Sequence, residues 1–92
     1  MTWNYSDEQK QLLSDPRYRP GVLLNAARRR MSVTSDRQLA DRLGTDTSVI
    51  ARTRNKKTYF SARLLLRILH HTGLTFDEAV SLSGYDVTRG RG

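Results

Sequence analysis

DRQLADRLGTDTSVIARTRNKK, residues 36–57, contains two short helical patterns separated by a glycine. In the first pattern Leu39 and Leu43 recur at the spacing of one helix face. Gly44 follows directly, and glycine most easily adopts the left-handed conformation that ends a helix. The second pattern begins after Asp46, a residue type that favours the N-terminal cap position, and it ends in basic residues. The stretch therefore predicts two helices joined by a tight turn.

The second helix of this pair is predicted to have a polar outer face. Ile50 and the methyl group of Thr53 share its inner side at helical spacing. Ala40 and Gly44, four residues apart, are small enough to let the two helices cross closely. The outer side carries no large apolar residue and consists of Thr47, Ser48, Ala51, Arg52 and Asn55. A helix with such a face can enter the major groove of DNA.

A further helix is predicted before the pair, over residues 20–31. Pro20 suits its first turn, because the missing N–H would have no partner there. The arginine run at residues 28–30 falls in its last turn, where positive charge complements the helix dipole and faces solvent. Ser35 then caps the first helix of the pair, and the Gln38 side chain is expected to reach back to that cap.

Two more helical patterns follow the pair. Ser61 is a cap residue for the first of them, and a wide apolar stripe makes us expect this helix to be the most buried. The stripe consists of Leu64, Leu65, Ile68, Leu69 and Thr72. Thr75 and Glu78 predict a capping box for the last helix, which ends at Gly84. The apolar residues of this last helix are Phe76, Ala79, Val80 and Leu82.

The 92 residues are enough for one small domain. No segment alternates apolar and polar residues over a useful length, so no sheet is expected. The sequence predicts an all-α fold, a compact five-helix domain over residues 20–84. An N-terminal arm over residues 1–19, which can hold a short helix, precedes this domain, and a basic tail over residues 85–92 follows it.

The composition favours an acidic partner. Sixteen Lys and Arg against nine Asp and Glu give a formal net charge of +7. Nucleic acid is the first candidate and an anionic membrane surface the second. The apolar runs are far shorter than the roughly 20 residues of a membrane-spanning helix, and no secretion signal is recognisable. Because the chain has no cysteine, disulfides and thiolate metal sites are excluded, and we expect a cytoplasmic protein.

The sequence contains no pattern for catalysis or for a cofactor. No nucleophile stands in the context of a triad, and the glycines do not form a phosphate loop. His70 and His71 are adjacent, so on a helix they point about 100° apart and cannot chelate one metal ion. We therefore expect no enzymatic activity, no cofactor and no bound metal.

QLADRLGTDTSVIARTRNKK, residues 38–57, resembles the helix-turn-helix of the Cro/repressor (XRE-type) DNA-binding family, whose motif is roughly L-A-x-x-L-G-x-x-x-S-x-I-x-R. SARLLLRILHHTGLTFDEA, residues 61–79, is similar to the last two helices of the family's five-helix domain. The segment TSDRQLA, residues 34–40, also resembles the start of this motif in the small prophage-borne subgroup. The resemblance spans about residues 22–84, and the motif positions are filled by Leu39, Ala40, Leu43, Gly44, Ser48, Ile50 and Arg52.

Four positions depart from the family pattern. Thr45 and Thr53 stand where the family usually has apolar residues, which predicts a lean core under the second helix of the pair. Asp36 and Thr47 replace two frequent glutamines. Because an acidic side chain beside a phosphate is unfavourable, we assign no phosphate contact to Asp36.

The resemblance implies a DNA interface. Arg52 is the candidate to read bases, because its planar fork matches guanine O6 and N7, a pairing worth about 1–3 kcal/mol of discrimination. Thr47 and Ser48 are expected at base edges or phosphates, and Asn55 at an adenine or the backbone. Phosphate contacts, which position the protein without reading sequence, are expected from the basic residues Arg37, Arg54, Lys56 and Lys57. Tyr59 and the helix N-terminus at Ser61 are expected to add further phosphate contacts. The full candidate set is Arg37, Thr47, Ser48, Ala51, Arg52, Arg54, Asn55, Lys56, Lys57, Tyr59 and Ser61.

The expected function is a transcriptional repressor or autorepressor that binds double-stranded DNA sequence-specifically. One motif contacts few base pairs, so we expect a homodimer on an inverted repeat, with recognition helices about 34 Å apart. The family resemblance favours a dimer surface at the last helix and the following residues, namely Leu82, Tyr85 and Val87. The aromatic N-terminal arm is the other candidate for this surface.

Two other functions stay open. In an antitoxin-like protein, the segment at residues 3–13 binds another protein while the helix-turn-helix binds a promoter. In a nonspecific nucleic-acid-binding protein, positive charge alone drives the interaction. Independently of these functions, the tail TRGRG is interpreted as a disordered basic end, with an arm for the minor groove as the alternative.

Overall fold

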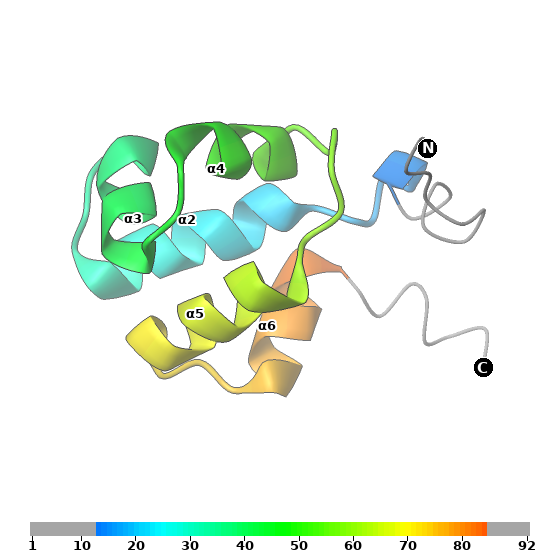
Figure 1. The fold of residues 1–92 in the computed structure, drawn as a ribbon. Coiled ribbons are helices and arrows are strands. Elements are labelled where there is room, and N and C mark those ends of the chain that lie inside the picture. Colours follow the sequence, from blue (N-terminus) through cyan, green and yellow to red (C-terminus); the bar gives the residue numbers. More distant parts are fainter. Residues whose placement is uncertain (1–12, 85–92) are drawn as a thin grey trace.

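Five complete helices and no strand are found in residues 13–84, which are the residues that the computed structural model describes. The all-α prediction is confirmed for this part of the chain, and the helices follow the ranges expected from sequence (Figure 1). They are α2 (Pro20–Met31), α3 (Asp36–Leu43), α4 (Thr47–Arg54), α5 (Ala62–Thr72) and α6 (Phe76–Ser83). Most of the N-terminal arm and the whole basic tail, with Tyr85 and Val87, lie outside the described residues.

The central helix of the fold is α2. It contacts α3, α4, α5 and α6, and Figure 1 shows α4 and α6 on opposite sides of it. By contrast, α5 buries only Leu64 and Ile68 fully, and its Leu66 is 65% exposed. The prediction that α5 is the most buried helix was wrong, because a wide apolar stripe does not reveal how many neighbours a helix has. The buried residues of α2 are Pro20, Leu23, Leu24, Ala26, Ala27 and Met31.

Aliphatic side chains from all five helices form one core. Burying each such side chain contributes about 1.5–3 kcal/mol. Phe60, in the loop between α4 and α5, joins this core, whereas Phe76 at the start of α6 is 57% exposed. Ile50 and Thr53 are 0% and 1% exposed, so the predicted inner face of α4 is confirmed.

The predicted caps of α5 and α6 are present. The Ser61 hydroxyl accepts a hydrogen bond from the Leu64 N–H at 3.1 Å. At α6 the capping box is complete, because the Thr75 hydroxyl accepts from the Glu78 N–H and the Glu78 carboxylate accepts from the Thr75 N–H. Hydrogen bonding from Thr75, chiefly from its backbone N–H, holds the pKa of the Glu78 carboxyl below its usual value.

The caps at α3 and α4 differ from the prediction in two details. The Ser35 hydroxyl accepts from the Gln38 N–H as expected, but Gln38 Oε1 accepts from the Thr34 N–H at 2.8 Å and not from the cap residue. The donor is therefore shifted by one residue, from Ser35 to Thr34. Asp46 occupies the cap position of α4, yet its side chain makes no capping hydrogen bond.

The chain just before α2 is packed into the fold, although we assigned it to the N-terminal arm. The Tyr18 side chain is 0% exposed. The Arg19 N–H donates to the Ser83 carbonyl oxygen at 2.8 Å, which ties this segment to the end of α6. Gly84, with φ +80°, lies so close that an added Cβ would come within 2.0 Å of the Arg17 carbonyl oxygen.

Candidate nucleic-acid interface

A three-residue turn, residues 44–46, joins α3 to α4. Gly44 has φ +71°, the left-handed conformation predicted for it. The Thr45 N–H donates to the Ala40 carbonyl oxygen at 2.9 Å, which satisfies a carbonyl at the end of α3. Ala40 itself is 1% exposed, and α3 packs directly on α4. The turn thus fixes where α4 begins.

The Arg67 side chain of α5 hydrogen-bonds to this turn, a contact that was not predicted from the sequence. Its Nη1 atom donates to the carbonyl oxygens of Leu43 and Gly44, both at 2.8 Å. The last carbonyls of a helix have no partner within the helix and need donors from elsewhere. The available signal was a long basic side chain beside the apolar stripe of α5, but its partner depends on the tertiary fold.

The outer face of α4, defined as Thr47, Ser48, Ala51, Arg52 and Asn55, is exposed at all five residues. The buried side of the same helix rests on α2 and α3. Among the described residues, none forms a hydrogen bond or ion pair with the Arg52 side chain. Its donors are therefore open to a ligand, and so are the exposed cations of Arg37 and Lys57.

Arg54, by contrast, is engaged within the protein. Its Nε and Nη2 atoms donate to the two carboxylate oxygens of Asp36 at 3.0 and 2.8 Å. Its Nη1 atom donates to Oδ1 of Asn25 at 2.8 Å. Arg54 lies at the end of α4, Asp36 at the start of α3 and Asn25 in the middle of α2. The side chain that we expected at a phosphate therefore links three helices.

Lys56 and Tyr59, in the loop after α4, also face the protein's own chain. The Lys56 ammonium donates to the Asp15 carbonyl oxygen at 2.8 Å and lies 5.9 Å from the centre of the Tyr18 ring. The Tyr59 ring stacks on Tyr18 at a centroid distance of 6.4 Å. Partial burial raises the pKa of the Tyr59 hydroxyl above its usual value.

The N-terminus of α5 lies beside the turn. A small cleft of about 90 Å³ there brings Thr45 together with Ser61, Arg63 and Arg67. Arg63 is exposed and stands in the first turn of α5, where the helix dipole disfavours positive charge. Arg63 was not among the residues predicted from the sequence, although its unfavourable charge at the start of a helix was a signal.

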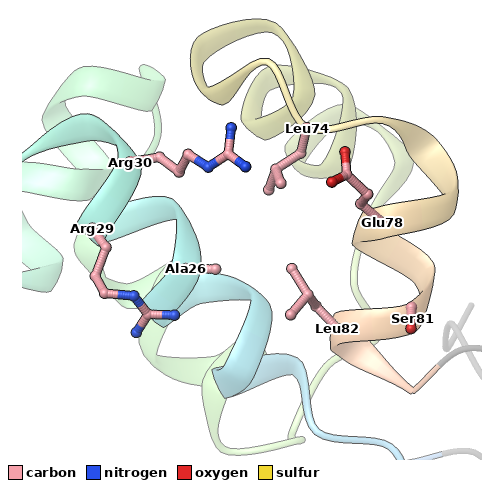
Figure 2. Close-up of a pocket in the computed structure, with 7 residues that line it drawn as sticks. All are labelled: Ala26, Arg29, Arg30, Leu74, Glu78, Ser81 and Leu82. Carbon is pink, nitrogen blue, oxygen red and sulfur yellow. The ribbon is translucent and has the colours of Figure 1, made fainter.

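A larger groove of about 570 Å³ lies between α2 and α6 (Figure 2). Because α4 and α6 flank α2 from opposite sides, this groove is separate from the outer face of α4. Leu82, a predicted dimer residue, is half-buried in its wall. Within residues 13–84, no cluster of His, Asp or Glu could hold a metal ion. The groove is lined by Ala26, Arg29, Arg30, Leu74, Glu78, Ser81 and Leu82.

The arginine run of α2 is divided between two surroundings. Arg28 donates to the Thr34 carbonyl oxygen and lies 3.7 Å from a carboxylate oxygen of Asp36. Arg30 lies in the α2–α6 groove, with its Nη1 atom 3.4 Å from the Thr72 carbonyl oxygen. The prediction that the whole run faces solvent at the end of the helix holds best for Arg29, which is exposed at the groove wall.

Comparisons with protein-family models, with curated proteins and with solved structures found no match for this chain. No helix in the described residues has the length and apolar character that crossing a membrane requires.

Proposed function

We propose that this protein is a sequence-specific DNA-binding regulator that inserts α4 into the major groove. The observation that carries this proposal is the outer face of α4, whose five small or polar side chains are all exposed while Ile50 and Thr53 anchor the opposite side. The motif resemblance over residues 38–57 and the formal net charge of +7 support the same function.

In this proposal the described residues have different roles. Arg52 reads a guanine, and Thr47, Ser48 and Asn55 lie at base edges or the adjoining backbone. Arg37 and Lys57, whose side chains are exposed, contact phosphates. The N-terminus of α5, with Ser61 and Arg63, contacts a phosphate of the same DNA strand. A homodimer on an inverted repeat supplies the second half-site, and binding represses transcription by occupying an operator.

The division between reading and positioning can be tested with Arg52→Ala and Lys57→Ala. We expect Arg52→Ala to relax base preference at one position of each half-site, at a cost of about 1–3 kcal/mol for the preferred base. Lys57→Ala is expected to weaken all sequences alike and to lower the salt slope of binding by about one. Binding titrations with matched and singly mismatched duplexes at several salt concentrations measure both effects. Identical behaviour of the two variants would contradict these roles.

A nonspecific basic protein makes the opposite prediction in a competition experiment. At fixed salt, a sequence-specific reader keeps a preference of roughly 10³ or more for a selected duplex over a random one. Binding driven by charge alone gives a ratio near one, because phosphates are the same in every sequence. The measured ratio therefore distinguishes the two functions.

A further inference from the structure

We propose that Arg54, Asp36 and Asn25 form a clasp that sets the position of α4 for DNA reading, and that Arg54 acts through this clasp and not as a phosphate contact. The inference rests on the proposed function and adds positioning residues to it. Its starting observation is that all three hydrogen bonds of the clasp join α4 to other helices.

The geometry of the clasp suits a fixed orientation. The paired bonds from Nε and Nη2 to one carboxylate allow only one relative orientation of the Arg54 and Asp36 planes. The side chains of Arg54 and Asp36 are 25% and 26% exposed, so solvent screens their interaction only in part. The stem of Arg54 also covers Gly21 of α2, where an ideal Cβ would lie 3.7 Å from Arg54 Cγ.

Few fully buried side chains hold α4 in place, although Val49 also packs against the core. The helix has eight residues, and only Ile50 and Thr53 are buried. Thr53 offers one methyl group where a larger aliphatic side chain would bury more apolar surface. At the N-terminus of α4, Asp46 supplies no capping hydrogen bond. The clasp fixes the opposite end, directly before Asn55 and Lys57.

The clasp also accounts for an acidic residue beside a surface proposed to meet DNA. Asp36 stands next to the exposed Arg37 in the first turn of α3. Alone, its charge would repel phosphates. Held between Arg54 and, at 3.7 Å, Arg28, the carboxylate is neutralised by its neighbours. Removing the Asp36 charge is therefore expected to weaken DNA binding if Arg54 belongs to the clasp, and to strengthen it if Arg54 contacts a phosphate.

The decisive experiment compares Arg54→Lys, Arg54→Ala and Asp36→Asn in DNA titrations at several salt concentrations. The matched control is Arg29→Lys, at an exposed arginine of α2 that has no role in the proposed interface. Lysine keeps the charge but cannot form the paired bonds. The clasp therefore predicts about tenfold weaker binding to a selected duplex for all three clasp variants. It also predicts an unchanged salt slope for Arg54→Ala and near wild-type binding for Arg29→Lys. The titrations are carried out at a temperature at which thermal melts show every variant to be folded.

Other outcomes overturn the inference. If Arg54 contacts a phosphate, Arg54→Lys binds almost as wild type, Arg54→Ala lowers the salt slope by about one, and Asp36→Asn strengthens binding by removing a negative charge. Those results would refute the clasp and leave the proposed function standing. A wild-type protein with no preference between selected and random duplexes would instead refute the proposed function, and the role of the clasp in reading with it.

Discussion

Replacing Ala51 with glutamate is expected to weaken binding to a selected duplex by about 100-fold or more. Ala51 is exposed in the middle of the outer face of α4, one turn from Thr47, Ser48 and Asn55. In the proposed complex, a carboxylate at this position would lie between the phosphates on both sides of the major groove, and such like-charge contacts cost several kcal/mol. Glutamate has a helix propensity close to that of alanine, so the fold of α4 is preserved.

The matched control is Ser81→Glu. Ser81 is an exposed residue of α6, which lies on the far side of α2 from α4. Both variants carry the same added charge, so the overall electrostatic loss is shared and the difference reports the local contact. Titration at one fixed salt concentration, with thermal melts of both variants, makes the comparison. Equal losses of affinity would contradict an interface centred on α4.

Replacing Gly84 with alanine is expected to have the largest effect on stability among the glycine substitutions, a loss of about 3 kcal/mol. Its positive φ, +80°, costs a residue with a Cβ about 1–2 kcal/mol. The Cβ would also stand 2.0 Å from the Arg17 carbonyl oxygen, so the backbone must move, at a further cost of about 1–3 kcal/mol.

Gly73→Ala is the control for this substitution. Gly73 has nearly the same φ, +75°, but nothing lies within 4 Å of its Cβ position. Its loss should be confined to the backbone cost of about 1–2 kcal/mol. Chemical denaturation of both variants gives the two free energies of unfolding. Losses of equal size would show that Arg17 does not approach Gly84 in solution, and that the segment before α2 is not packed as described.

The helices could be predicted because their signals are local. Ser61, Thr75 and Gly44 act on atoms within a few residues of themselves, so their types and spacing suffice. The outer face of α4 could be predicted equally well, since helical periodicity separates Ile50 and Thr53 from the exposed residues. These features required no knowledge of the tertiary fold.

The contacts that position α4 could not be predicted because they join distant parts of the chain. Arg54 donates to Asp36, 18 positions away in the sequence, and Arg67 donates to the Leu43 carbonyl oxygen, 24 positions away. A long basic side chain has many possible partners, and only the packing of α2, α3 and α5 selects one. For the same reason the sequence placed Arg54 at a phosphate, and the burial of Tyr18 was not foreseen.

Selection of bound duplexes from a random pool, run in parallel with the wild-type protein and Arg52→Ala, tests sequence reading by α4 most directly. The account predicts that the wild-type protein enriches two inverted half-sites whose centres are one DNA turn apart, about 10 base pairs. It predicts that Arg52→Ala enriches the same site with one guanine-containing position relaxed in each half. A wild-type pool without enrichment, or an identical site from both proteins, would contradict it.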